Sequence, residues 1–402
     1  MRRVVVTGLG MINSVGLDKE SSFKAILDGK CGIKRISSFD TTNHSVKIAG
    51  EIEGFDPKTV MNPKDVKKAD RFIQLGIKAA AEAMEDAKFD SFDADRFGVS
   101  SASGIGGLIA IEKNSLVCDD RGPRRISPFF IPSALVNMLG GFVAIAHKIK
   151  GPNISSVTAC AAGTHAISAA AKTIMTGGAD KMLVVGAEAA ICAVGVGGFS
   201  SMKALSTRND DPTHASRPFD KDRDGFIIGE GAGALILESY EDAVARGAHI
   251  YGELIGFGES GDAYHITTPE LGGAYRSMKA AYEMAGCPNI DYINAHGTST
   301  AANDKNETAA VKMLFEKDVP LMSSIKGQIG HCLGAAGAIE AVVSLMAIRD
   351  QILPPTINYE TLDSDCDLDY IANKARKADV NIVMSNSFGF GGTNGSVIFK
   401  KI

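Results

Sequence analysis

The sequence predicts an α/β protein of two similar halves in stacked α-β-α-β-α layers, with helices of both halves packed at the centre. Short runs rich in branched residues alternate with helix-forming segments throughout the 402 residues. With 45% hydrophobic residues, a chain of this length can bury a large core. We expect the first half to span residues 1–250 and the second half residues 251–402.

The second half of the chain repeats the pattern of the first. A strand runs into Gly-Leu-Gly at residues 8–10 and into Gly-Phe-Gly at residues 256–258. A pair of serines then precedes a helix of small residues in each half, at residues 155–156 and 323–324. The first half has about 80 more residues between these points, and we expect the extra residues to form loops that shape a site or an interface.

The first element is a buried strand from Arg3 to Thr7, followed by an expected turn at residues 8–10. The glycine spacing excludes a dinucleotide-binding turn, because Asn13 stands where the third glycine belongs. Asn62 and Pro63 predict the start of a helix that ends near residue 87. Further strands are predicted at residues 96–101, 154–158, 181–186, 232–238, 251–258 and 321–325. Further helices are predicted at residues 161–176, after the strand 232–238 as far as residue 245, and at residues 333–349.

Cys160 lies where a β-prone run changes into an alanine-rich helix. Free N–H groups and the positive end of the helix dipole favour a thiolate at such a position, and the thiolate is the nucleophile. An inert core cysteine is the alternative, so the other polar clusters must decide.

Three such clusters follow strands in the second half. Residues 292–300 include His296, residues 323–331 include Lys326 and His331, and residues 386–394 form a glycine-dense turn. All of them can gather at one sheet edge beside the cysteine. Two histidines at strand ends within loops of small residues favour catalysis over a structural role.

The charge pattern excludes several kinds of partner. A net charge of -5 without long basic runs argues against nucleic acid. Residues 220–225 resemble a calcium loop, but Gly231 stands where the closing glutamate belongs. Arg217 and Arg223 offer the loop carboxylates partners, so we expect a structural ion-pair loop and no metal site.

The seven cysteines are scattered without CxxC pairs, which suits a reducing compartment. The N-terminal apolar run is too short for a signal peptide, and none reaches the roughly 18 residues needed to span a bilayer. We therefore expect a cytoplasmic protein without membrane insertion.

Two surface features point to protein partners. Lys64, Lys67 and Lys68 crowd the first turns of the predicted helix, where their charge opposes the helix dipole, so they form either a solvated face or a docking patch for an anionic partner. Phe129 and Phe130 lie between prolines, and we expect them in the core or in a subunit interface.

Five segments resemble, in order and over essentially the whole chain, the β-ketoacyl-acyl carrier protein synthases, condensing enzymes with a thiolase-like fold. The segments are TACAAGTHA, DRDGFIIGEGAG, NAHGTST, GHCLGAAG and NSFGFGGTN. The resemblance implies a decarboxylative Claisen condensation that lengthens an acyl chain by two carbons. It also implies acyl carrier protein as partner, acyl and malonyl thioesters as substrates, a homodimer, and no cofactor, because the phosphopantetheine arrives on the carrier protein.

The resemblance assigns roles to the candidate residues. Cys160 would carry the acyl chain, and its N–H with that of Phe390 would form the oxyanion hole. His296 and His331 would donate hydrogen bonds to the malonyl thioester carbonyl. Lys326 would orient the site.

The resemblance also implies supporting and binding residues. Glu307 would be the ion-pair partner of the catalytic lysine, and Phe390 would gate the acyl pocket. Substrate-binding positions would be Thr298, Thr300, Phe199, Phe388, Gly389 and Gly391. Carrier-protein docking would fall to Lys64, Lys67, Lys68 and Lys203.

Single residues distinguish the condensing function from other functions that occur in this fold. A thiolase needs a second cysteine in the C-terminal glycine turn, where Ser387 and Phe388 stand, and an initiating ketosynthase would have asparagine in place of one histidine. A non-catalytic chain-length partner would lack Cys160. A polyketide-type ketosynthase uses the same chemistry and stays open.

Overall fold

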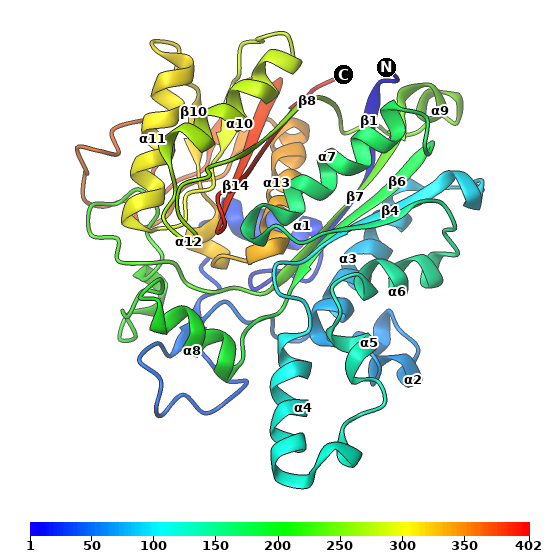
Figure 1. Ribbon diagram of the computed structural model, residues 1–402. Coiled ribbons are helices and arrows are strands. Elements are labelled where there is room, and N and C mark those ends of the chain that lie inside the picture. The colour runs from blue at the N-terminus through cyan, green and yellow to red at the C-terminus, as the bar shows by residue number, and fades with distance from the viewer.

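The computed structural model describes residues 1–402, and its centre is one ten-stranded sheet (Figure 1). The strand order is β10-β9-β13-β14-β8-β1-β7-β6-β4-β5. The first half contributes β1 (Val4–Asn13), β4 (Phe97–Ala102), β5 (Asn153–Ser156), β6 (Lys181–Glu188) and β7 (Gly231–Ser239). The second half contributes β8 (Gly252–Gly261), β9 (Tyr292–Asn294), β10 (Leu321–Ser323), β13 (Ile382–Gly389) and β14 (Thr393–Lys400). Two small ribbons pair β2 (Lys34–Arg35) with β3 (Ile48–Ala49) and β11 (Ile352–Leu353) with β12 (Arg376–Lys377).

The two halves of the sheet mirror each other about the junction of β1 and β8. These strands pair only through Val5 with Glu253 and Val6 with Gly252. Outward from the junction, β1-β7-β6-β4-β5 corresponds to β8-β14-β13-β9-β10 in both chain order and position. The predicted repeat is therefore confirmed. The division into domains at residue 250 stays a prediction, because the sheet runs through both halves.

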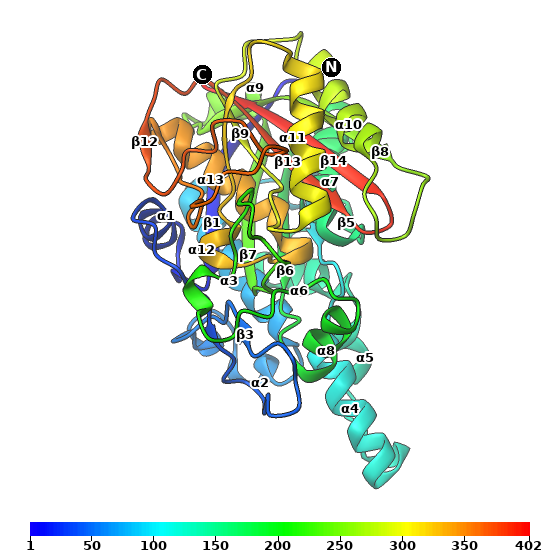
Figure 2. The ribbon, with the colours of Figure 1, turned by 90° about the vertical axis from the view of Figure 1, so that its left-hand side faces the viewer.

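Together with the helices, the two halves of the sheet form five layers in the order α-β-α-β-α. The helices are α1 (Lys19–Leu27), α2 (Pro63–Val66), α3 (Arg71–Ala87), α4 (Leu108–Arg121), α5 (Phe130–Ala134), α6 (Met138–His147), α7 (Ala162–Met175), α8 (Ala193–Ser201), α9 (Tyr240–Ala245), α10 (Leu271–Met284), α11 (Ala301–Phe315), α12 (Lys326–Ile329) and α13 (Ala336–Asp350). In the centre, α7 and α13 pack on each other and on strands of both halves. On the outside, α3 covers β1, β7 and β6, while α10 covers β8 and β14 with α11 beside it (Figure 2).

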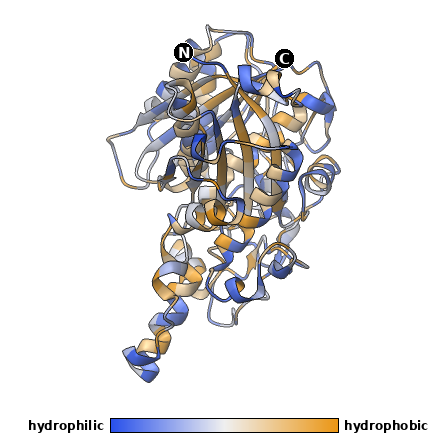
Figure 3. Cartoon of the chain, turned by 90° about the vertical axis from the view of Figure 1, so that its right-hand side faces the viewer, coloured by the Kyte–Doolittle hydropathy of each residue, from blue (hydrophilic) through white to orange (hydrophobic).

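The central layer is the most deeply buried. Every residue of α13 from 336 to 348 is buried, as expected of a helix that is apolar on all sides. Figure 3 shows apolar residues concentrated in the strands and central helices, and α4 projecting from the body. The extra residues of the first half include α4 to α6, between β4 and β5.

The turn expected at residues 8–10 is wrong, because these residues lie within β1. A Cβ on Gly10 would lie 2.0 Å from the backbone oxygen of Ala79 on α3, and one on Gly258 would lie 2.1 Å from that of Ser277 on α10. The glycines therefore let an outer helix touch the strand backbone, in the same way in both halves.

The single helix expected from residue 62 to residue 87 is also wrong. Asn62 caps the short α2 as predicted, but the chain leaves the helix at Lys67 and restarts α3 with Asp70 as its N-cap. One oxygen of Asp70 caps α3, and the other accepts the N–H of Ala110, which fixes the break. Lys67 and Lys68 follow α2 and lie two to three residues before Asp70, so they are still near the N-terminus of the longer α3.

The ion pairs expected around residues 220–225 are present. Asp220 accepts the guanidinium of Arg217 at 2.9 Å, and Arg223 pairs with Asp363 at 2.6 Å and Asp304 at 3.7 Å. No group of three or more His, Cys, Asp or Glu side chains is arranged to hold a metal ion. None of the helices combines the length and apolar character needed to cross a membrane.

Candidate active site

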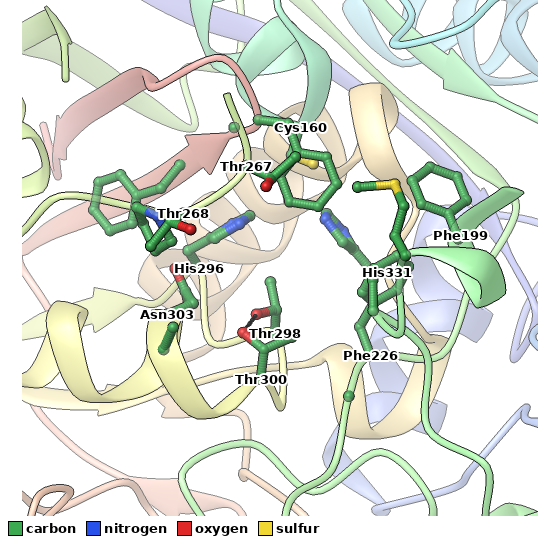
Figure 4. Close-up of a pocket in the computed structure, with 18 of the residues that line it drawn as sticks. Cys160, Phe199, Phe226, Thr267, Thr268, His296, Thr298, Thr300, Asn303 and His331 are labelled. Atoms are coloured by element: carbon green, nitrogen blue, oxygen red, sulfur yellow. Dashed lines mark hydrogen bonds between the residues drawn. The ribbon is translucent and has the colours of Figure 1, made fainter. Parts of the chain in front are cut away.

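A pocket of about 370 Å³ brings the nucleophile candidate together with the polar clusters of the second half (Figure 4). The sequence-predicted residues that line it are Cys160, Phe199, Lys203, His296, Thr298, Thr300, His331, Phe388, Gly389 and Phe390. Lys326 and Glu307 are buried and do not line it, and neither do Gly391, Lys64, Lys67 and Lys68.

Cys160 sits in the 3-10 turn Ala159–Ala161 that leads into α7, with a 7% exposed side chain. Ala159 has a left-handed φ of 49°, a strained conformation for a residue with a Cβ. Burial raises the pKa of the Cys160 thiol to about 12, although the N–H of Phe390 and the charge of Lys326 oppose this shift. This pKa favours the thiol over the thiolate expected at a helix N-terminus, because desolvation outweighs the helix dipole.

His296 follows β9 and His331 follows α12, and both imidazoles point toward Cys160 (Figure 4). Their ring centroids are 5.3 Å apart with an interplanar angle of 82°. Burial, followed by the charge of Lys326, lowers the pKa of both well below 6.5, so both rings are neutral. The buried Nδ1 atoms of both rings have no hydrogen-bond partner.

Lys326 forms its ion pair with Glu340 on α13, not with Glu307 as expected. The oxygens of Glu307 are already occupied, because each accepts a backbone N–H at 2.8 Å, from His296 and Gly297. Glu307 therefore supports the site by fixing the backbone at His296. Lys326 supports it through its charge, which favours neutral imidazoles.

The glycine-dense turn joins β13 to β14 and carries Phe390 over the pocket. A Cβ on Gly389 would lie 3.0 Å from the oxygen of Thr158, next to the nucleophile turn. Gly391 is exposed and has a φ of 82°, and a Cβ added to it would meet no atom within 4 Å. The N–H of Gly391 donates to Ile266 O at 2.7 Å, which ties the turn to the loop after β8.

Aromatic rings form the walls beside the histidines. Phe199 on α8 packs edge-on against Phe226 at 5.5 Å, and Phe226 packs against His331 at 5.3 Å. Phe388 packs against His296 at 5.7 Å. These contacts hold the imidazoles in apolar surroundings.

The polar mouth of the pocket is formed mainly by α11 and the turn before it. The hydroxyls of Thr298 and Thr300 lie 3.0 Å apart, and Asn303 lines the pocket one helical turn further on. Lys203 lines the same pocket and is exposed.

Of the lysines predicted to dock a partner, Lys64 and Lys67 are exposed. Lys68 is half-buried and pairs with Asp65 at 2.7 Å. Figures 1 and 2 both place α2 and α8 in the lower part of the molecule. In Figure 1, α8 lies on the left and α2 on the right of that part.

Sequence reasoning missed several groups at the site. Phe226, Asn303, Asp262, Thr267 and Thr268 also line the pocket. Glu340 had a signal, because it is the only acidic residue in an otherwise apolar helical stretch before Asp350. The loop after β8, which contributes Asp262, Thr267 and Thr268 to the pocket, had no signal in the sequence, because neither a periodic pattern nor a motif marks it.

Comparison with known proteins identifies the family to which the chain belongs. Residues 1–243 match the family "Beta-ketoacyl synthase, N-terminal domain" and residues 251–360 match "Beta-ketoacyl synthase, C-terminal domain". The 3-oxoacyl-[acyl-carrier-protein] synthase 2 of Vibrio cholerae is 50% identical over all of this chain and 99% of its own length. That of Staphylococcus aureus is 46% identical over 100% of this chain and 98% of its own.

Solved structures of ketosynthases match the fold of this chain over its whole length. The crystal structure of a beta-ketoacyl synthase from Burkholderia phymatum matches with a TM-score of 0.93 at 33% identity, covering 100% of both chains. A type II PKS ketosynthase, solved in complex with its acyl-carrier protein, matches with a TM-score of 0.91 at 33% identity over 100% of this chain and 99% of its own. The chain therefore belongs to the β-ketoacyl synthase family.

Proposed function

We propose that this protein is a 3-oxoacyl-acyl carrier protein synthase that elongates fatty acids by condensing malonyl-acyl carrier protein with an enzyme-bound acyl chain. The observation that carries the proposal is the meeting of one buried cysteine and two neutral imidazoles in a single pocket. Full-length relatives named for this activity are 46–50% identical, whereas the polyketide ketosynthase is 33% identical, which favours the fatty-acid role.

The first half-reaction loads the acyl chain. The sulfur of Cys160 attacks the thioester carbonyl, the bond to the pantetheine sulfur breaks, and the thiol proton leaves with that sulfur. The N–H groups of Cys160 and Phe390 are the donors for the carbonyl oxygen as it gains charge. Since the resting group is a thiol, its proton departs as the attack proceeds rather than beforehand.

The second half-reaction forms the carbon–carbon bond. The malonyl carboxylate leaves as CO2, and its electron pair passes into an enolate whose oxygen accepts hydrogen bonds from His296 and His331. The enolate carbon then attacks the acyl carbonyl, the bond to Cys160 breaks, and the released sulfur takes up a proton from solvent to restore the thiol. A neutral imidazole has one N–H. With no partner for the buried Nδ1, that proton is better placed on Nε2, where a substrate oxygen can accept it.

Acyl carrier protein is the proposed donor of both substrates. The exposed Lys64, Lys67 and Lys203 offer positive charge to an acidic carrier, and Thr298 and Thr300 offer hydroxyls to the pantetheine arm. The ketosynthase that matches at TM-score 0.91 was itself solved with its acyl-carrier protein.

A homodimer is the proposed assembly, formed along the free edge of β5. Beside this edge, Ile145 on α6 is exposed by 78% and Val157 after β5 by 54%, and at α5, which packs on α6, Phe129 is exposed by 39% and Ile131 by 58%. An apolar edge of this kind is usually covered by a partner, and a second copy would extend the sheet across the interface. Light scattering during size exclusion tests this, with a twofold mass expected and a monomer contradicting it.

Intact mass spectrometry tests the function. Wild type and Cys160→Ala are exposed to a long-chain acyl-acyl carrier protein, and malonyl-carrier protein or malonyl-coenzyme A is then added. We expect an acyl adduct on the wild type alone, released as 3-oxoacyl-carrier protein with the carrier-bound malonyl group. A wild type that forms no adduct would exclude the condensing function and favour a non-catalytic partner role.

A further inference from the structure

His165 lies on α7, shortly after Cys160 in the segment TACAAGTHA, and the function above gives it no role. Its half-buried imidazole does not line the pocket. The ring lies instead between the turn that carries Cys160 and the glycine-dense turn. Nδ1 is 2.7 Å from the hydroxyl oxygen of Thr158, and Nε2 is 3.1 Å from the backbone oxygen of Asn394.

The partners of the His165 ring define the direction of both hydrogen bonds. A backbone carbonyl can only accept, so the proton of a neutral ring lies on Nε2 and is donated to the oxygen of Asn394. Nδ1 then carries a lone pair, which accepts the hydroxyl proton of Thr158. One chain of hydrogen bonds thus runs from Thr158 through His165 to Asn394, and each bond polarises the next.

A second hydrogen bond holds Thr158 against the same strand. The hydroxyl of Thr393 donates to the backbone oxygen of Thr158 at 3.0 Å, at the start of β14. The side chain and the backbone of Thr158 are therefore both bound to this part of the chain. The strand also packs directly on the imidazole, because a Cβ on Gly395 would lie 3.0 Å from Cδ2 of His165.

The two turns joined in this way carry the two donors of the proposed oxyanion hole. Cys160 lies just after Thr158 in one turn, and Phe390 follows Gly389 directly in the other. The turns meet backbone to backbone, since a Cβ on Gly389 would lie 3.2 Å from the nitrogen of Ala161. Oxyanion-hole donors act only within about 3 Å of the charged oxygen, so the spacing of the two turns decides how strongly they act.

We propose that His165 is a positioning residue that ties the turn of Cys160 to the glycine-dense turn and thereby sets the spacing of the two oxyanion-hole donors. This rests on the proposed function, in which the N–H groups of Cys160 and Phe390 stabilise the carbonyl oxygen. His165 lies outside the pocket wall and acts through Thr158 and Asn394, so loss of the ring lets the donors move from their positions.

The test opens this bridge at two places, with His165→Leu, Thr158→Val and the double variant. Each protein is loaded from an acyl-acyl carrier protein that is isotope-labelled at the thioester carbon, and intact mass gives the loading rate. Infrared difference spectra of the loaded enzymes then report the carbonyl stretch, which rises when hydrogen bonds to the carbonyl weaken. Thr173→Val is the matched control, because this half-buried hydroxyl of α7 bonds Ala169 O at 2.8 Å, about 12 Å along the helix from His165.

We expect each single variant to load about tenfold more slowly, which is part of the roughly 100–1,000-fold cost of losing a whole oxyanion donor. The carbonyl stretch should rise in both single variants and no further in the double variant, because either change opens the same bridge. The control should keep the wild-type rate and frequency.

A carbonyl stretch at the wild-type frequency in the variants would overturn the proposal even if loading is slow, because a purely structural role does not change the hydrogen bonds to the carbonyl. Shifts that add in the double variant would also overturn it. If His165→Leu does not fold, Thr158→Val decides by the same frequency. A wild type that takes no acyl chain would instead refute the function itself.

Discussion

Replacing His331 with asparagine tests whether the active-site imidazoles are neutral donors. The pKa of His331 is well below 6.5, because the ring is buried and Lys326 lies nearby. Above pH 6.5 the ring is neutral in both the folded and the unfolded chain and contributes no pH dependence. Below pH 6.5 the imidazole binds a proton in the unfolded chain but not in the folded protein. The free energy of unfolding therefore decreases as the pH is lowered.

The magnitude follows from this linkage. With an unfolded pKa near 6.5 and a native ring that stays neutral, each imidazole costs about 2 kcal/mol of stability at about pH 5. His331→Asn removes that cost. The difference in unfolding free energy between variant and wild type should therefore move by about 2 kcal/mol in the variant's favour between about pH 7.5 and about pH 5. Comparing the two proteins cancels the buried carboxylates, whose raised pKa values act in the opposite direction.

Denaturant unfolding followed by circular dichroism at both pH values measures this difference, with the exposed His249→Asn as control for the loss of a histidine. Side-chain nitrogen NMR of labelled histidine gives an independent reading and should show a neutral Nε2–H tautomer persisting to pH 5. An equal difference at both pH values, or an imidazolium signal from the native protein near pH 6, would refute neutral donors and with them the proposed enolate stabilisation.

Three further predictions concern support, packing and docking. Lys326→Met leaves the buried Glu340 without its partner, so we expect a loss of about 3–5 kcal/mol in unfolding free energy and an activity profile whose acid limb moves to higher pH; an unshifted limb would contradict the electrostatic role. Gly10→Ala drives a Cβ into the backbone oxygen of Ala79, and thermal unfolding should show a loss of about 1–3 kcal/mol, whereas a neutral result would mean that α3 can move away freely. Lys67→Glu should raise the KM for acyl-acyl carrier protein several-fold but leave turnover of acyl-pantetheine unchanged, and an equal effect on both substrates would remove this lysine from the docking surface.

The local pattern of the sequence predicted the repeat, which the structure confirms, and most of the predicted site residues line one pocket. Strands at residues 181–186 and 232–238 lie within β6 and β7, and Asn62 caps a helix as its side chain requires. The polar clusters meet in one pocket because each follows a strand of the same folded sheet. Strand ends and caps depend on neighbouring residues, which a single sequence displays.

Features that depend on contacts distant in the chain were not predictable in this way. Whether Gly10 makes a turn or admits a helix depends on α3, which begins some sixty residues later. The helix break before Asp70 is fixed by Ala110. The partner of Lys326 was misassigned, because two buried glutamates are candidates and only their packing decides between them.

The sequence by itself predicted the fold class and the family resemblance from periodicity and short motifs, and the resemblance singled out Cys160, His296 and His331 as the candidates for catalysis. The tertiary structure decided their protonation states. A helix N-terminus favours a thiolate at Cys160, yet burial raises the pKa of the thiol, and burial with the charge of Lys326 keeps the imidazoles neutral. Desolvation and charge depend on every atom around a group, so they exist only once the chain has folded.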